Sequence, residues 1–390
     1  MDVKIDVDQK KVDVNGTLLI DFKNQDSITL YLWRNTTMYK VISEKNNVSF
    51  TFDTLKALPL PFIGNAGKLV VQNPKTRRES QQIQFEYSCD MSRNMAGFGK
   101  TFTDEWIEMG YYAAWYPVHE GSRNFISEVR ISINKDYKIN GSGLVTRMNN
   151  YWQMDQPWET FDILIVASKD LKTKKMEQGN IRVETAYATF PETDIDSLII
   201  TFSDVLEFFT TRFGGQSGEV YLKFIIDPTE GLGAYGRKNL IRIKASKFSN
   251  YFKRGIAHEL SHSWWQKADK KTWQDWLNES FAEYSMLLYM RERIGRDLYN
   301  ETIETYKKDA RKMPPIWGIE RTSKDAYTTL YEKGSLLLIA LEQKLGKEQM
   351  SAFLRLIIDK SINNTADYLK ILEESSSKEI KDWFEDQLKK

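Results

Sequence analysis

Histidine and cysteine are scarce in this chain, which has three histidines and one cysteine in 390 residues. The single cysteine, Cys89, excludes an intrachain disulfide framework and a cysteine-rich zinc module, so we expect a small buried side chain there. Long apolar runs are also missing, because the longest ones, 163–167 and 336–341, are far shorter than the roughly 20 residues that span a bilayer. The N-terminus lacks the apolar stretch of a signal peptide. We therefore expect a cytoplasmic protein, or the soluble part of a secreted or membrane-anchored one.

The chain also lacks an excess of either positive or negative charge. The chain has 55 basic and 54 acidic residues, for a net charge of +1. This balance gives no basis for a nucleic-acid partner or for binding to an anionic membrane surface. Apolar residues make up 41% of the chain, which is typical of a globular protein, and the length suits two or three domains. No sequence feature indicates an oligomeric state.

The pattern of the chain changes near its middle. Segments up to about residue 190 alternate apolar and polar residues and are interrupted by Asn, Gly and Asp, which is typical of β-strands. From about residue 194 the apolar spacing becomes helical, apart from one strand at 219–228 and a glycine-rich stretch at 231–245. We therefore predict a multidomain α+β protein, with a β-rich domain over 1–193 and a mainly helical domain with a small sheet over 194–390.

Two of the three histidines lie in the segment AHELSHSWWQK, four residues apart. On a helix, His258 and His262 lie on the same face, so their imidazoles can bind one Zn²⁺ ion. Glu259 then projects beside the metal, where it can take a proton from a water molecule. This is the H-E-x-x-H pattern. The alternative is a pair of ordinary core or surface histidines.

A third zinc ligand is available in the downstream segment WLNESFAEY, which has the spacing of a second helix. If the two helices pack side by side, Glu279 reaches the histidines and completes a His₂Glu site for one zinc ion per chain. Glu283, one turn further on, can accept a hydrogen bond from a ligand histidine, or it is simply an exposed helix residue. Asn278 is either an ordinary helix cap or an orienting group.

HELSHSWW followed by TWQDWLNESFAEY resembles the aminopeptidase N family of zinc metallopeptidases, which are gluzincins. The segment AYTTLYEKGSLLLIALEQKLG is similar to the Y-x-K-G helix of this family. The resemblance implies that Tyr331 stabilises the oxyanion, which suits a phenol that keeps its proton at neutral pH. It also implies a saddle-like N-terminal β-domain and a thermolysin-like catalytic domain. We expect the family's large C-terminal helical domain to be absent.

The sequence departs from the family pattern in two places. Sixteen residues separate His262 from Glu279, whereas the family has eighteen, and a shorter loop can absorb the difference. The family's G-A-M-E-N element, whose glutamate binds the free amino group of the substrate, is matched by Gly233, Ala234, Tyr235, Gly236 and Arg237. The glutamate position is occupied by Gly236. We expect Arg237 to place a cation next to the gap, which would disfavour an ammonium group there.

These observations predict a zinc-dependent metallopeptidase that acts on a peptide or protein substrate, like aminopeptidase N. An extended substrate can pair with the strand that contains Gly233–Arg237. One alternative is an endopeptidase, or a peptidase for N-blocked or longer peptides, because the glutamate that binds the N-terminus is replaced. A second alternative is a non-catalytic peptide-binding module.

Overall fold

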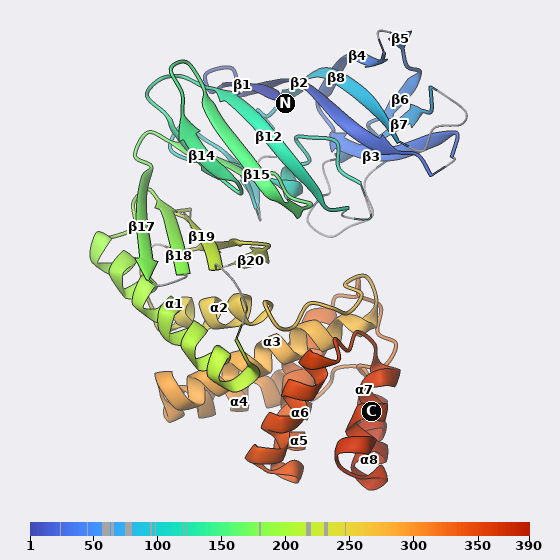
Figure 1. Cartoon of the computed structure of the whole chain (residues 1–390), viewed down its shortest axis with the longest axis vertical. Coiled ribbons are helices and arrows are strands. Elements are labelled where there is room, and N and C mark those ends of the chain that lie inside the picture. Colours follow the sequence, from blue (N-terminus) through green and yellow to red (C-terminus); the bar gives the residue numbers. More distant parts are fainter. Residues whose placement is uncertain are drawn as a thin grey trace.

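The computed structural model separates a β-rich part from a helical part (Figure 1). It describes the chain except for residues 24, 45, 57–62, 64–65, 75–79, 94–95, 98, 120, 122, 179–180, 216–219, 230–232 and 246. One sheet lies between the two parts, with its strands beside helices α1 (Glu192–Phe213) and α2 (Asn250–Ser261). The predicted fold class, a β-rich domain followed by a mainly helical one, is confirmed.

The N-terminal part is built from three sheets whose strands alternate buried and exposed residues. In β1, Val3 and Ile5 are buried whereas Asp2 and Lys4 are exposed, as expected for a sheet with one face in the core. The largest sheet has the order β14-β15-β12-β1-β2-β8-β4-β5. Its strands are β1 (Asp2–Asp6), β2 (Lys11–Asp21), β4 (Thr36–Ser43), β5 (Asn46–Asn47), β8 (Ser80–Asp90), β12 (Phe125–Ser132), β14 (Leu144–Arg147) and β15 (Trp152–Thr160).

Two smaller sheets complete this part of the molecule, with the orders β13-β16-β11-β10-β9 and β3-β7-β6. Their strands are β3 (Ser27–Trp33), β6 (Phe50–Asp53), β7 (Ala66–Gln72), β9 (Ala96–Gly97), β10 (Lys100–Phe102), β11 (Ile107–Met109), β13 (Lys138–Gly141) and β16 (Ile165–Ser168). Cys89 is buried, as the sequence predicts.

The sheet next to the helices has the order β17-β18-β19-β21-β20. Its strands are β17 (Lys172–Gln178), β18 (Ile181–Tyr187), β19 (Val220–Asp227), β20 (Ala234–Arg237) and β21 (Leu240–Lys244). Strands β18 and β19 are parallel and are joined through α1, so they form a βαβ unit. The domain boundary at 193/194 remains a prediction. Because β17 and β18 pair into this sheet, we propose that the boundary lies before β17.

The helical part surrounds the two helices that carry the H-E-x-x-H and W-L-N-E segments. The helices are α1 (Glu192–Phe213), α2 (Asn250–Ser261), α3 (Trp276–Tyr289), α4 (Arg296–Ala310), α5 (Gly334–Leu345), α6 (Lys347–Asp359), α7 (Thr365–Ser375) and α8 (Lys378–Leu388). Helix α1 ends where predicted, because Gly214 adopts a positive φ of 95°. A π-helical segment, η4 (Thr328–Lys333), leads directly into α5.

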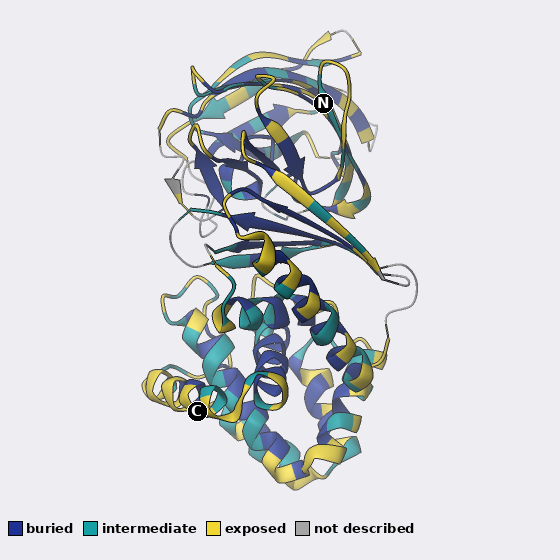
Figure 2. Ribbon diagram, turned by 90° about the vertical axis from the view of Figure 1, so that its left-hand side faces the viewer, coloured by how far each residue is buried: buried dark blue, intermediate teal, exposed yellow. Residues whose placement is uncertain are grey.

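Burial is concentrated in the sheets and in the inner helices, while the outer helices expose one face (Figure 2). Helix α3 is buried along almost its whole length, which fits its central position. An apolar cluster joins the N-terminal sheets to the sheet that lies next to the helices; it consists of Trp106, Leu164, Val166, Leu171, Ala186, Ala188, Ile225 and Leu240. Within the described ranges, the helices are too short or too polar to cross a membrane.

Candidate active site

Helix α2 places the two histidines of the H-E-x-x-H segment side by side. Its first turn is capped by Ser249, whose hydroxyl accepts a hydrogen bond from the amide of Phe252. His258 lies in the last turn and His262 is the C-cap residue, so the pair retains helical spacing. Their ring centroids are 5.0 Å apart. Both imidazoles therefore face the same space, as the spacing predicts.

Glu279, in the first turn of α3, faces the two histidines. Its Oε2 atom lies 3.5 Å from Nε2 of His258 and 3.4 Å from Nε2 of His262. The candidate ligand atoms of these three residues all lie within 4.8 Å of one another. Glu279 Oε2 is buried and makes no hydrogen bond within the described part of the chain. A buried carboxylate oxygen between two imidazole nitrogens is a donor set that fits zinc.

Further hydrogen bonds orient each histidine. Nδ1 of His258 lies 2.7 Å from Oε2 of Glu283, and Nδ1 of His262 lies 2.9 Å from the carbonyl oxygen of Trp265. If Nδ1 carries the proton in both rings, Nε2 is left as the metal ligand. The hydroxyl of Tyr306 donates a second hydrogen bond to Glu283. Sequence reasoning identified Glu283 but missed Tyr306 and the Trp265 carbonyl, because no local pattern points to either.

The carboxylates also change the proton affinity of the histidines. Burial acts to lower the pKa of His258, but the neighbouring carboxylate of Glu279 and the hydrogen-bonded carboxylate of Glu283 raise it well above its ordinary value. Burial acts to raise the pKa of Glu279, yet the two histidines hold it well below its ordinary value. Without a metal, the site therefore favours protonated imidazoles, and a zinc ion would have to displace those protons.

Asn278 holds together the connection between the two ligand helices. Its amide group donates to the carbonyl of Ala268 and accepts from the amide of Ala268, both at 3.1 Å. It also donates to Asp275 at 2.8 Å. These bonds close the segment that follows α2 onto the start of α3. The shorter gap between His262 and Glu279 is accommodated in this loop.

Glu259 and Tyr331 contact different elements next to the candidate ligands. A Cβ atom built on Gly236 would lie 2.8 Å from Oε2 of Glu259, so the carboxylate lies directly against β20. Tyr331 lies in η4 and stacks on the ring of His258, with centroids 5.7 Å apart and an angle of 6°. Burial and the nearby Glu279 raise its pKa well above the ordinary value. Its hydroxyl therefore stays protonated and can donate a hydrogen bond.

A close contact fixes Tyr331 relative to the metal ligands. A Cβ atom on Gly334 would lie 1.9 Å from the hydroxyl oxygen of Ser280, the residue that follows Glu279. The hydroxyl of Ser280 donates to the carbonyl oxygen of Leu330, one residue before Tyr331. The glycine of the Y-x-K-G segment therefore allows η4 to pack against α3.

Strand β20 forms the edge of its sheet and pairs with β21. Its residues alternate between two faces. The side chain of Tyr235 is buried, and its hydroxyl lies 3.4 Å from Oε1 of Glu108 in the N-terminal part. Gly236 faces Glu259 instead. Gly233, which precedes the strand with a positive φ of 147°, and Ala234 are partly exposed. The predicted segment Gly233–Arg237 therefore borders the candidate metal centre, although the side chains of Tyr235 and Arg237 point away from it.

The prediction that Arg237 places a free cation next to Gly236 is wrong. The side chain of Arg237 is 8% exposed, and its Nε donates to Asp162 at 2.9 Å. Its guanidinium lies over the rings of Tyr235, at 4.3 Å, and Phe161, at 4.7 Å. Arg237 therefore bridges the catalytic sheet to the N-terminal part and does not present its charge to the site.

Arg242 makes a second buried bridge. It donates two hydrogen bonds of 2.8 Å to the carboxylate of Glu108 and a further one to Asp227. The arginine is 1% exposed and both carboxylates are fully buried. Three buried carboxylates near β20, namely Glu108, Asp162 and Asp227, are thus each paired with an arginine.

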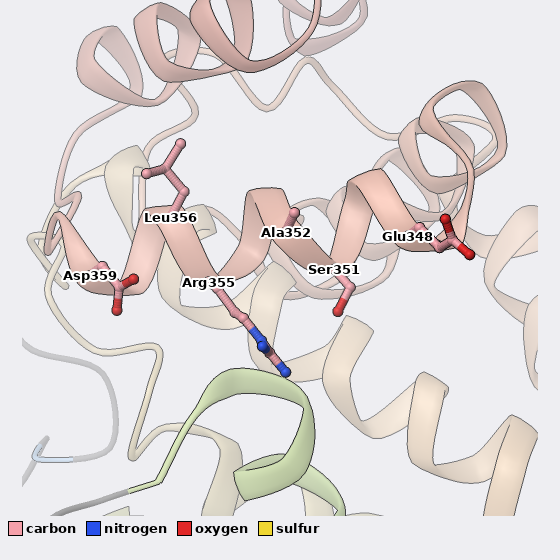
Figure 3. A pocket seen from close by; sticks show the side chains of 6 residues that line it. All are labelled: Glu348, Ser351, Ala352, Arg355, Leu356 and Asp359. Carbon is pink, nitrogen blue, oxygen red and sulfur yellow. The ribbon is translucent and has the colours of Figure 1, made fainter.

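A surface hollow of about 530 Å³ lies on helix α6, outside the candidate active site (Figure 3). It is lined by Glu348, Ser351, Ala352, Arg355, Leu356 and Asp359. Arg355 points toward the end of α1, where it donates to the carbonyl oxygens of Thr211 and Arg212. None of the predicted site residues lines this hollow.

Known proteins share both the domain and the fold of this chain. Residues 237–386 match the sequence model of the peptidase family M1 domain. An M1 zinc metallopeptidase from Deinococcus radiodurans superposes with a TM-score of 0.69 at 18% identity, over 100% of this chain and 92% of that one. A two-domain M1 zinc metallopeptidase with bound L-tryptophan gives a TM-score of 0.71 at 17% identity, over 100% and 93% of the two chains.

Native leukotriene A4 hydrolase from Saccharomyces cerevisiae has a TM-score of 0.70 at 16% identity. The match covers 98% of this chain and 65% of the yeast enzyme, so this chain spans slightly less than two thirds of its length. No curated protein matches the sequence. Residues 237–386 thus carry a peptidase family M1 domain, and the chain as a whole has the fold of M1 zinc metallopeptidases.

Proposed function

We propose that this chain hydrolyses peptide bonds with the residue roles of an aminopeptidase N-like enzyme. In this proposal His258, His262 and Glu279 hold the metal. The observation that carries it is the buried, unbonded Oε2 of Glu279 between the Nε2 atoms of the two histidines. Zinc bound there would supply Lewis acidity for the attacking water and the scissile carbonyl.

The protein side chains transfer the proton, stabilise the oxyanion and orient the metal ligands. Glu259 takes a proton from the attacking water on its carboxylate and delivers it to the leaving amine. Tyr331 donates a hydrogen bond to the oxygen that gains negative charge, and stacking on His258 holds its ring in place. Glu283 fixes the orientation of His258, and Asn278 fixes the start of the helix that carries Glu279.

This proposal is tested with zinc-loaded protein and a mixture of unstructured peptides, with the products mapped by mass spectrometry. We expect cleavage by the native chain and at least about 100-fold slower cleavage by Glu259→Gln. Zinc content measured on both proteins shows whether the variant keeps its metal. Equal rates for the two proteins would refute the proposal.

A second candidate function is cleavage of N-blocked or longer peptides. It is favoured by Gly236, which stands where the family has its amine-binding glutamate and which has the carboxylate of Glu259 close against it. The paired carboxylates of Glu108 and Asp162 offer no free charge to an ammonium group. Each peptide is therefore compared with its N-acetylated form. Similar kcat/KM values for both forms support this candidate, whereas a strong preference for free N-termini, with removal of one residue at a time, supports aminopeptidase activity.

A further inference from the structure

Arg321 is a charged residue near the metal centre that the proposed catalytic roles leave unused. It lies in the segment between α4 and η4, and its side chain is 28% exposed. Its guanidinium carbon lies 6.0 Å from the centroid of the Tyr331 ring. Burial acts to lower the pKa of Arg321, but the surrounding groups, including Tyr331, Asp275 and Glu279, raise it. The group is therefore a permanent cation beside the proposed oxyanion donor.

Asp275 binds the guanidinium of Arg321 through its Nε atom only. Nε of Arg321 donates to Oδ2 of Asp275 at 2.7 Å, while Oδ1 of Asp275 accepts from Asn278. Asp275 is 1% exposed, so the anchor itself is buried. Within the described part of the chain, the terminal nitrogens of Arg321 donate to no partner. A guanidinium that is anchored through Nε and open at its terminal nitrogens can bind a second carboxylate.

The packing of the elements shows on which side of the metal centre Arg321 lies. Helices α2 and α3 are antiparallel, because His258 meets Glu283 whereas His262 meets Glu279. Asp275 and Arg321, at the start of α3, are therefore at the C-terminal end of α2. Strand β20 runs in the same direction as α2. The side chain of Tyr251, at the start of α2, lies near the backbone of Gly233, and the carboxylate of Glu259, near the end of α2, lies next to Gly236. Arg321 thus lies toward the Arg237 end of the edge strand.

A peptide that adds to the free edge of β20 pairs best in the antiparallel sense, which gives the more stable ladder. Its N-terminal residues then lie toward Arg237, and its C-terminal residues lie toward Gly233. The guanidinium of Arg321 consequently lies on the amino-terminal side of the scissile bond. An ammonium group gains nothing from a cation in this position, whereas an acidic side chain does.

We propose that Arg321 is a specificity-determining residue that binds the carboxylate of an acidic side chain immediately before the cleaved bond. This inference rests on the proposed peptide hydrolysis at the same site. It identifies the substrates as peptides with Glu or Asp at that position. Asp275 acts as a positioning residue that keeps the guanidinium in place.

The test uses zinc-loaded protein and a set of matched hexapeptides that carry either Glu or Gln before the cleaved bond. A second pair carries the same exchange after that bond, and each peptide is made with a free and an acetylated N-terminus. Mass spectrometry locates the cleaved bond. We expect the native chain to favour Glu over Gln before the bond by about tenfold in kcat/KM, mostly through KM, because a charge-assisted hydrogen bond is gained.

Two variants show whether Arg321 causes this preference. Arg321→Met is expected to bring the Glu/Gln ratio to about one, and Arg321→Lys to retain part of the preference because the charge remains. Lys324→Met is the matched control, since it removes an exposed charge from the same segment, and it should leave the ratio unchanged.

A ratio of one in the native chain, a preference that lies after the bond, or a ratio that Arg321→Met does not change would overturn the assignment of Arg321. In each of these cases Glu259-dependent cleavage persists, so the proposed function stands. If no peptide is cleaved in a Glu259-dependent manner, the proposed function and this inference both fail.

Discussion

The metal centre and the substrate edge of this site are built in different ways. The proposed metal centre consists of His258, His262 and Glu279, which come from the end of one helix and the start of the next. The substrate edge is β20 with the preceding Gly233, and its position depends on bridges to the N-terminal part through Arg237 and Arg242. The proposed metal ligands thus lie close together in the sequence, whereas the position of the proposed substrate edge depends on contacts between residues far apart in the sequence.

The largest expected effect is a loss of folding stability when a bridge to the substrate edge is removed, while the metal centre still binds zinc. Arg242→Met would leave Glu108 and Asp227 buried without their partner, and breaking a buried pair in this way costs about 3–5 kcal/mol. We expect urea unfolding to show a loss of this size, while the folded protein still binds one zinc ion. The control is Arg130→Met, which removes an exposed ion pair and should cost less than about 1 kcal/mol. Equal losses in the two variants would mean that the buried bridge does not stabilise the substrate edge.

Tyr331→Phe tests the metal centre, where we expect a loss of activity without a loss of stability. It retains the ring that stacks on His258 and removes only the hydroxyl. We expect kcat to fall by about 10²–10³-fold, because a hydrogen bond to the oxyanion is lost, with little change in stability or zinc affinity. Steady-state kinetics and zinc titration measure the two effects. Tyr327→Phe is the control, because Tyr327 stacks on Tyr331 but is 58% exposed. A kcat unchanged in Tyr331→Phe would remove this tyrosine from the mechanism.

A smaller effect is expected from Glu283→Gln. The amide can still hydrogen-bond to His258 but carries no charge, so the imidazole becomes a weaker ligand. Zinc affinity, measured by competition with a chelator, should fall by about 10–100-fold. Unchanged affinity would show that Glu283 has only a packing role.

A final prediction concerns the dependence of zinc affinity on pH. The carboxylates raise the pKa of His258 and of His262 in the metal-free protein, despite the opposing effect of burial. Below these pKa values each imidazole holds a proton that zinc must displace. Affinity should therefore fall as pH falls, by roughly tenfold per pH unit for each proton displaced, and it should level off above the raised pKa values. A flat profile from pH 8 to pH 5 would contradict this electrostatic account.

Much of the metal centre could be predicted from the sequence, because residues that are four apart in a helix lie on the same face of that helix. The His258–His262 spacing and the helix that starts at Trp276 both follow from local patterns. The roles of Glu259, Glu279 and Tyr331 remain predictions that the variants test. The helix end at Gly214 was equally predictable, since glycine there adopts a positive φ.

The substrate edge was harder to predict. The sequence indicates a glycine-rich strand but not that Arg237 turns toward Asp162, which lies 75 residues earlier. The partners of Glu283 also escaped prediction, because Tyr306 comes from a helix with no local pattern that links it to the metal centre. Likewise, β17 and β18 have the same pattern as the other early strands, so their pairing with the later sheet was not visible. Each of these features depends on tertiary packing.

Zinc stoichiometry in two single variants tests the central claim most directly. We assign Glu279 to the metal and Glu259 to the proton, although both carboxylates lie next to the histidines. Elemental analysis after dialysis against trace zinc should therefore find about one zinc ion per chain in Glu259→Gln, with peptide cleavage lost, and almost none in Glu279→Gln. The account is contradicted if Glu279→Gln keeps its zinc, or if Glu259→Gln keeps native activity.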